Sequence, residues 1–229
     1  MKFGKYIIFS ILFSILISTC LAETSNSNNE RTLASQESID AQFKLGSIYY
    51  SEQDYENAFE WFQRAANQGD KFSQHKIASM YYSGQGVKQD YGKAFEWFHK
   101  SAEQGYDDSQ YRLGVMYAMG KAVKQDYAKA LEWFLKGANQ GNAYLQYRVG
   151  EMYYEGQGTV KNYEKALEWF LKGANQGNAY LQYRVGEMYY EGQGTVKNYE
   201  KALEWFLKGA NQGNAYLQYR VGEMYYEGQ

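Results

Sequence analysis

A long stretch of this sequence repeats itself without a single change. Residues Lys129 to Gln193 recur as Lys165 to Gln229, at an offset of 36 positions. Periods of about 20–50 residues are typical of repeat architectures, in which each supersecondary unit buries its apolar face against its neighbours. The chain is therefore predicted to be an array of stacked repeats and not one irregular globular core.

Each repeat has the pattern of two helices joined by a glycine turn. The first helix carries apolar residues at helical spacing, as Val149, Met152 and Tyr153 do. The second helix carries Ala-x-x-Trp-Phe five times and stops at a glycine, which accepts the left-handed conformation that closes a helix. Polar residues suited to capping the second helix precede it at Asp54, Asp90, Asp126, Asn162 and Asn198. The repeats start near Ala41, Ser73, Ser109, Leu145, Leu181 and Leu217.

A small residue follows the leading aliphatic residue of every first helix. A glycine inside a helix costs about 1 kcal/mol relative to alanine, so its recurrence predicts a second helix that crosses closely at that point. The aromatic residues at helical spacing, namely the Trp-Phe pairs and a recurring tyrosine, are predicted to form the core. The small residues are Gly46, Ala78, Gly114, Gly150, Gly186 and Gly222, and the tyrosines are Tyr49, Tyr81, Tyr117, Tyr153, Tyr189 and Tyr225.

These motifs resemble the Sel1-like repeat, a relative of the tetratricopeptide repeat. The string Leu-Gly-x-Met-Tyr, then Gly-x-Gly-x-Val, then Asp-Tyr-x-Lys-Ala-x-x-Trp-Phe carries the resemblance, which covers residues 39–229. It implies an all-α fold, a right-handed α-solenoid that serves as a protein-interaction scaffold. The first repeat departs from the pattern with a turn four residues shorter, the third has Ala122 in place of the second turn glycine, and the last is incomplete.

The first 22 residues have the pattern of an export signal. Lys2 and Lys5 precede the apolar stretch from Tyr6 to Ile17, and a small-residue cleavage site ends at Ala22. Residues 1–22 are therefore predicted to be a signal peptide, and the protein to be periplasmic or secreted. The alternative is an uncleaved membrane anchor, although the apolar stretch is shorter than the roughly 20 residues of a membrane span.

Cys20 is the only cysteine of the chain. Cleavage after Ala22 removes it, so the mature protein is expected to contain no disulfide. Alternatively Cys20 is lipidated, although Thr19 stands where a small residue normally precedes a lipidated cysteine. Residues 23–38 are polar and are predicted to form a flexible spacer before the repeats.

Charge and composition argue against several kinds of ligand. The formal net charge is −2, so no basic field exists to hold a phosphate backbone and no nucleic-acid partner is expected. His75 and His99 alone do not supply the three or four N or S donors of a zinc site. The glycine turns lack the Gly-Lys-Ser/Thr of a phosphate-binding loop. We therefore expect neither a metal nor another cofactor.

One short motif resembles that of an enzyme. Ser73 and Lys76 have the Ser-x-x-Lys spacing of serine acylases, in which the lysine activates the hydroxyl. However, Ser109 and Arg112 occupy the same register, and neither Ser-Asp-Asn nor Lys-Thr-Gly is present. The motif is interpreted as part of the repeat template, and the protein is not expected to be an enzyme.

A stripe of tyrosine and glutamate recurs on the first helices of the last three repeats. Spacings of three, four and three residues keep it on one helix face, and the resemblance implies that first helices line the concave surface of the array. Tyrosine offers a large contact area at low entropic cost together with a hydroxyl group, which suits recognition. The alternative is that several rings seal neighbouring repeats together. The stripe consists of Tyr144, Tyr147, Glu151 and Tyr154, then Tyr180, Tyr183, Glu187 and Tyr190, then Tyr216, Tyr219, Glu223 and Tyr226.

The sequence thus predicts an exported scaffold that binds a peptide or protein partner on a tyrosine-lined concave surface. The glutamates of the stripe are expected to favour basic side chains of the partner. A binder of cell-wall glycan or peptidoglycan is the second hypothesis, because tyrosine faces also stack on sugar rings. A β-lactam-acylating hydrolase built on Ser73 is the third.

Overall fold

The computed structural model describes residues 38–229, which contain eleven α-helices and no strand. The predicted signal peptide, Cys20 and nearly all of the predicted spacer lie outside the described residues. Two compact units are present, one up to Trp97 and the other Phe98–Gln229. The first contains α2 (Ile39–Ser51), α3 (Tyr55–Asn67) and α4 (Lys71–Ser83), and α5 (Tyr91–Glu103) crosses the boundary.

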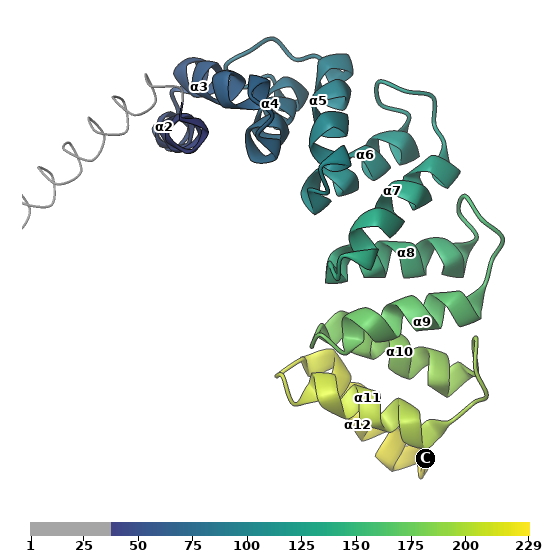
Figure 1. Ribbon diagram of the computed structural model, residues 1–229. Helices are drawn as coiled ribbons and strands as arrows, with labels where there is room; N and C mark the ends of the chain where they lie inside the picture. The colour runs from purple at the N-terminus through teal and green to yellow at the C-terminus, as the bar shows by residue number, and fades with distance from the viewer. Residues whose placement is uncertain (1–37) are drawn as a thin grey trace, which may run out of the picture. The chain divides into compact units, whose positions relative to one another are not determined.

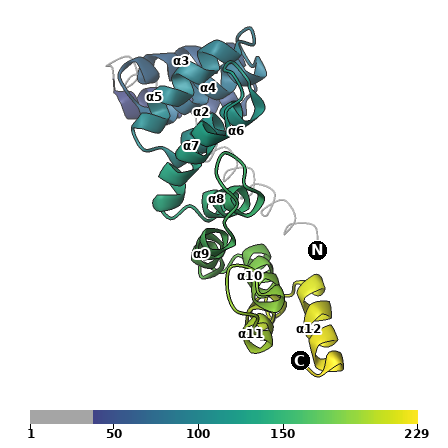
Figure 2. The same cartoon turned by 90° about the vertical axis from the view of Figure 1, so that its right-hand side faces the viewer.

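The second unit is a run of helices in which each packs on the next one along the chain. Figures 1 and 2 show this stacking from α8 to α12. The helices alternate between first and second members of a repeat, so the predicted all-α solenoid class is confirmed. They are α6 (Asp107–Met119), α7 (Tyr127–Asn139), α8 (Ala143–Glu155), α9 (Tyr163–Ala174), α10 (Ala179–Glu191), α11 (Tyr199–Ala210) and α12 (Ala215–Glu227).

The predicted caps of the second helices are present. Asp126 accepts a hydrogen bond from the backbone N–H of Lys129 at 3.0 Å, and Asn162 accepts one from Lys165 at 2.8 Å. The first helices begin two residues earlier than the sequence pattern indicated. Every first helix except α6 has a side-chain cap at this earlier start, as in α8, where the Asn142 side chain accepts a hydrogen bond from the backbone N–H of Leu145.

Four of the glycines in the first helices lie against phenylalanines of the second helices, as predicted, whereas Gly222 on α12 meets no atom within 4 Å. Phe134, Phe170 and Phe206 are fully buried. A Cβ atom added to Gly150 would overlap the ring of Phe170, and one added to Gly186 would overlap that of Phe206. These repeats therefore form their core by seating a ring on the bare backbone of a glycine, whereas the second repeat has Ala78 at this position.

The predicted aromatic core is confirmed except at the end of the array. Trp133, Trp169 and Trp205 are buried, and Tyr153 and Tyr189 are partly buried against the core clusters. Tyr225 is instead 65% exposed. No described helix follows α12, so nothing covers this ring as α9 and α11 cover its equivalents.

Buried glutamines form a network that the sequence analysis missed. Gln146 of α8 donates to the carbonyl oxygen of Ala138 near the end of α7, at 3.2 Å. It also accepts from Gln176, which follows α9, at 2.8 Å. Gln182 repeats both bonds one repeat later, with Ala174 and Gln212. Each glutamine thus ties the first helix of its repeat to the ends of two second helices.

Candidate binding surface

The twelve residues of the predicted stripe lie on α8, α10 and α12, four on each helix. Their identical spacing gives them equivalent positions in successive repeats, because the three helices share one sequence, AYLQYRVGEMYYE. The structure separates the stripe into three parts with different surroundings. These are a row of tyrosines along one edge, a row of ion pairs, and a second set of tyrosines near the glycine turns.

Six tyrosines form a continuous row across four repeats, which we call the tyrosine ladder. Each ring contacts the next, with centroids between 5.1 and 6.3 Å apart. The contacts between repeats are edge-to-face and those within a helix are tilted. These geometries are the ones that aromatic pairs prefer. The ladder consists of Tyr111, Tyr144, Tyr147, Tyr180, Tyr183 and Tyr216.

The ladder alternates exposed and partly buried rings. Tyr144, Tyr180 and Tyr216 are about half exposed, at 51%, 49% and 52%. Tyr147 and Tyr183 are partly buried, and each ring stacks on the core phenylalanine of its own repeat, as Tyr147 does on Phe170 at 6.4 Å. The two alternatives for these rings therefore apply to different members, because some pack the array and others face solvent.

The hydroxyl groups of the inner ladder tyrosines are held in the neutral form. Burial raises the pKa of Tyr147 most, and the charge of Glu151 raises it further. Burial likewise raises the pKa of Tyr183, followed by its hydrogen bond with Tyr216. These phenols therefore keep their protons, and with them their ability to donate a hydrogen bond.

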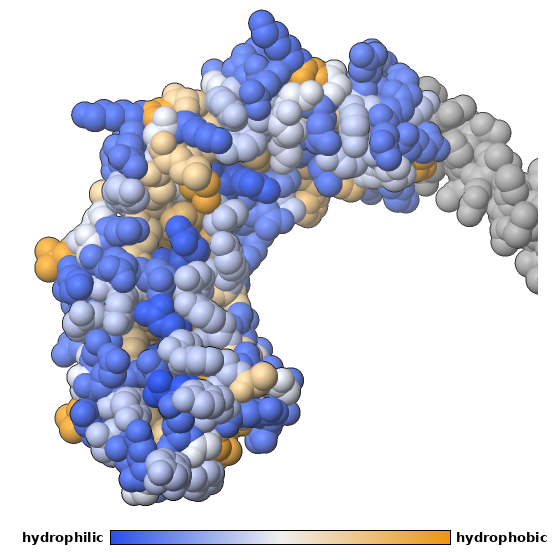
Figure 3. Space-filling model, turned by 180° about the vertical axis from the view of Figure 1, so that it is seen from behind, coloured by the Kyte–Doolittle hydropathy of each residue, from blue (hydrophilic) through white to orange (hydrophobic). Residues whose placement is uncertain are grey.

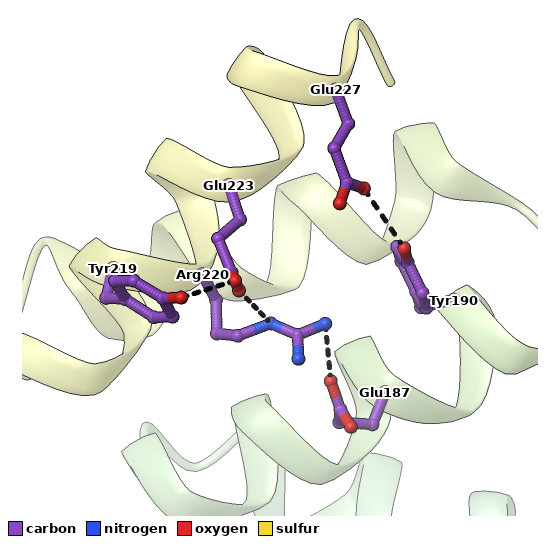
Figure 4. A network of polar contacts seen from close by, with 6 residues as sticks. All are labelled: Glu187, Tyr190, Tyr219, Arg220, Glu223 and Glu227. Carbon is purple, nitrogen blue, oxygen red and sulfur yellow. Dashed lines mark hydrogen bonds and ion pairs between the residues drawn. The ribbon is translucent and has the colours of Figure 1, made fainter.

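Tyr154 and Tyr190 serve contacts between repeats. The hydroxyl of Tyr154 donates a hydrogen bond to Gln193 in the turn of the next repeat at 2.8 Å, and its ring centroid lies 4.9 Å from that of Tyr163 in its own repeat. The hydroxyl of Tyr190 donates to Glu227 at 3.3 Å (Figure 4). On α12 the corresponding tyrosines of the stripe are more exposed, Tyr219 at 60% and Tyr226 at 93%.

The glutamates of the stripe are already matched with arginines, which the sequence analysis missed. Glu151 pairs with Arg184, and Glu187 pairs with Arg220 at 2.9 Å. Arg220 also lies 3.5 Å from Glu223, as Figure 4 shows. Burial by itself would lower the pKa of Arg184, but the charge of Glu151 and the hydrogen bonds with Tyr180 and Glu151 together outweigh burial, and the pKa is raised. These carboxylates are therefore occupied within the array, so they do not stand free to attract the basic side chains of a partner.

On the face of the molecule that Figure 3 shows, hydrophilic side chains predominate and strongly hydrophobic ones are scattered. Tyrosine is mildly hydrophilic on the Kyte–Doolittle scale that colours Figure 3, so a tyrosine-lined surface does not stand out there as an apolar patch. Val160 and Val196, at 85% and 84% exposed, are isolated apolar residues at the turns and need no functional explanation.

The residues of the Ser-x-x-Lys motif do not form a nucleophilic site. Ser73 is fully buried on α4. The ammonium nitrogen of Lys76 lies over the ring of Tyr50, 5.4 Å from its centroid. A serine nucleophile must be reached by its substrate, and this hydroxyl is covered by protein.

Among residues 38–229, no group of three or more His, Cys, Asp or Glu side chains could hold a metal ion. No described helix combines the length and apolar character that a membrane crossing requires.

The fold and the repeated surface define an α-solenoid of helix pairs. Comparison with known families specifies which one, because six consecutive segments match the Sel1 repeat. The chain therefore belongs to the Sel1 repeat family, as its motifs indicated. Sel1 repeats form a scaffold that is typically non-enzymatic and commonly mediates protein interactions. The matching segments are residues 39–70, 71–106, 107–142, 143–178, 179–214 and 215–229.

Solved structures support the assignment. The protein c5321, a protective antigen present in uropathogenic Escherichia coli strains, is 35% identical with a TM-score of 0.82, and the match covers 87% of this chain and 44% of c5321. A Sel1 repeat protein from Oxalobacter formigenes is 32% identical with a TM-score of 0.74, and the match covers 85% of this chain and 57% of that protein. The chain thus spans about half the length of these two relatives. No curated protein matches it.

Proposed function

We propose that this protein is an exported, non-enzymatic scaffold that binds a peptide segment or a protein partner on the tyrosine ladder. The observation that carries the proposal is the unbroken series of ring contacts from Tyr111 to Tyr216. A ligand that follows this series meets the same surface in each successive repeat. Affinity is therefore expected to increase with the number of repeats engaged.

The physical basis is a preformed aromatic surface. The inner rings are fixed by stacking on the core, as Tyr183 is on Phe206 at 6.2 Å. The outer rings are fixed by edge contacts with them, so little side-chain entropy remains to be lost when a ligand binds. Tyrosine is enriched among the residues that dominate binding energy at protein interfaces.

Export is proposed from the sequence pattern of residues 1–22. The test is the N-terminal sequence of the protein recovered from the exported fraction. A start at Glu23 supports cleavage after Ala22, whereas a lipid-modified start at Cys20 supports the lipoprotein alternative. An intact Met1 in a protein retained with the cells would contradict the proposal.

The binding test removes the three outer rings together. The triple variant Tyr144→Ser, Tyr180→Ser, Tyr216→Ser loses exposed ring surface but leaves the rings that pack on the core. Peptides are first selected on the wild-type protein from a random dodecapeptide display library. They are expected to bind the triple variant about tenfold or more weakly than the wild type. Thermal melts check that both proteins remain folded.

A matched control removes exposed apolar side chains elsewhere. The variant Tyr127→Ser, Val160→Ser, Val196→Ser alters a second helix and two turns, and it is expected to bind the selected peptides as the wild type does. Equal loss in both variants would show that the ladder is not the binding surface. Soluble peptidoglycan fragments are added as competitors, and their displacement of the peptides would favour the glycan alternative.

A further inference from the structure

Two ion pairs join the first helices of consecutive repeats. Glu151 of α8 pairs with Arg184 of α10, and Glu187 of α10 pairs with Arg220 of α12. In both pairs the glutamate precedes the arginine by 33 positions. Each guanidinium also lies over the core phenylalanine of the preceding repeat, at 4.8 and 5.3 Å from the ring centroid. The array thus supplies these partly buried cations with both a carboxylate and an aromatic face.

Arg148 occupies the same position on α8, but its carboxylate partner is missing. The residue 33 positions before it is Val115, and Ala118 stands where the next repeat has Tyr154. The guanidinium of Arg148 lies over Phe134 at 5.6 Å, as its counterparts lie over their phenylalanines. No carboxylate of residues 38–229 lies within ion-pair distance of it, and its Nε atom is covered by protein without a hydrogen-bond partner.

The surroundings of Arg148 combine positive charge with apolar and aromatic surface. Val115 and Ala118 are partly buried and pack on the core cluster of this repeat. The hydroxyls of Tyr111 and Tyr144, at the start of the tyrosine ladder, lie 3.4 Å apart. The charge of Arg148 reaches Tyr111, where it acts against the rise in pKa that burial causes. The side chains of α6 therefore supply neither the carboxylate nor the ring that the equivalent arginines contact.

We propose that Arg148 binds a carboxylate supplied by the ligand, which takes the place that Glu151 and Glu187 occupy for the next two arginines. The apolar part of that ligand residue rests on Val115 and Ala118. A guanidinium presents a planar set of donors that matches a carboxylate, and charge-assisted bonds of this kind are roughly twice as strong as neutral ones. The inference deepens the proposed function, because it sets the register and the chemistry of the peptide on the ladder.

The carboxylate can come from an aspartate or glutamate side chain or from a peptide C-terminus. Small probes distinguish these sources. N-acetylglutamate 1-amide carries only the side-chain carboxylate, N-acetylglutamine carries only the α-carboxylate, and N-acetylglutamine amide carries neither. Each is titrated into the ¹⁵N-labelled protein while the Nε–Hε resonance of Arg148 is followed by NMR. A saturable shift with one or both carboxylate probes, and none with the neutral probe, is expected.

Val115→Glu provides a specific block. It restores in this repeat the carboxylate that the following repeats possess, so Arg148 gains an internal partner and the probes should no longer shift its resonance. Arg148→Gln removes the donor fork, and Arg148→Lys keeps the charge but not the fork. Arg112 holds the equivalent position on α6 but is exposed, so Arg112→Gln is the matched control and should leave the titration of Arg148 unchanged.

Peptides selected from the dodecapeptide library provide the second readout. Those selected on the wild type are expected to contain an acidic residue or to need a free C-terminus, and replacing that group by an amide should weaken binding about tenfold or more. Arg148→Gln and Val115→Glu should weaken binding equally and abolish this dependence, whereas Arg112→Gln should not. Thermal melts check that each variant is folded.

The outcomes separate this inference from the proposed function. If the selected peptides lose affinity in the ladder variant but not in Arg148→Gln or Val115→Glu, the ladder binds and the carboxylate site is wrong. If the carboxylate probes shift the Arg148 resonance but no peptide depends on the ladder, the carboxylate site stands and the proposed function falls. A resonance that no carboxylate probe moves overturns the inference.

Discussion

The ring of Tyr147 on α8 lies edge-on to the ring of Tyr180 on α10, with the two centroids 5.3 Å apart. This contact recurs one repeat later between Tyr183 and Tyr216, at 5.1 Å. In both cases a partly buried ring that packs on its own core supports an exposed ring of the following repeat. The surface proposed to bind a partner is therefore continuous with the core that holds the repeats together.

The close approach of glycine and phenylalanine predicts opposite effects for one substitution at two equivalent positions. Gly186→Ala is expected to lower the free energy of unfolding by about 1–3 kcal/mol, because the added Cβ atom overlaps the ring of Phe206. Gly222→Ala lies in the same local sequence but meets no atom within 4 Å. It should instead raise the free energy of unfolding by up to about 1 kcal/mol through helix propensity. Urea denaturation measures both, and similar changes would contradict the close crossing.

The turn of the third repeat predicts a stabilising substitution. Ala122 adopts a left-handed conformation with φ of 63°, which favours glycine. Ala122→Gly is therefore expected to raise the free energy of unfolding by about 1 kcal/mol. The reverse change, Gly158→Ala, should be destabilising by more than this, because its Cβ atom would also overlap the backbone of Tyr127. Denaturation midpoints test the pair, and a loss of stability in Ala122→Gly would contradict the assigned conformation.

The buried glutamines predict a loss of stability that depends on position. Gln146→Leu removes two hydrogen bonds, to the carbonyl of Ala138 and from the amide of Gln176, and this loss is expected to cost about 1–3 kcal/mol. Gln218 occupies the same position on α12, where it is exposed and bonds only the carbonyl of Ala210. Gln218→Leu should therefore cost clearly less. Chemical denaturation compares them, and equal losses would show that the network does not act as described.

The inner ladder tyrosines predict the response of the protein to alkali. The pKa values of Tyr147 and Tyr183 are raised above the ordinary value of 10.0 in the folded protein. Their contribution to stability is therefore complete below about pH 10 and is lost as the pH rises towards the folded pKa, because the unfolded chain ionises first. Replacing both by phenylalanine removes this linkage, so alkaline unfolding should move to higher pH.

Circular dichroism and tyrosinate absorbance follow this alkaline transition together. The double variant Tyr225→Phe, Tyr226→Phe is the control, because it removes two phenol groups from α12 that lie outside the tyrosine ladder. In the wild type, part of the tyrosinate signal should appear only as helicity is lost. Complete ionisation of the tyrosines while the protein is still helical would contradict the pKa shifts.

Much of the fold follows from local sequence signals. The caps at Asp126 and Asn162, the helix-ending glycines and the period of the apolar residues act within one or two turns of the chain, and the structure contains all of them. The crossing at Gly150 could also be foreseen, because a glycine that recurs inside a helix needs a compensating contact. The candidate surface was predicted only as a set of residues. The pairing of Glu151 with Arg184 was missed, although a constant separation of 33 positions between acid and base is visible in the sequence.

Three helices of identical sequence differ in the burial and contacts of their side chains, which their sequence alone does not determine. The helices α8, α10 and α12 share every residue, and the sequence determined their length, their caps and their helical face. Yet Tyr183 is partly buried whereas Tyr219 is 60% exposed, and Gly186 faces a ring whereas Gly222 faces open space. Only the tertiary structure decided these differences. Burial, ion pairing and ring contacts depend on which helix packs alongside, and that neighbour belongs to another repeat.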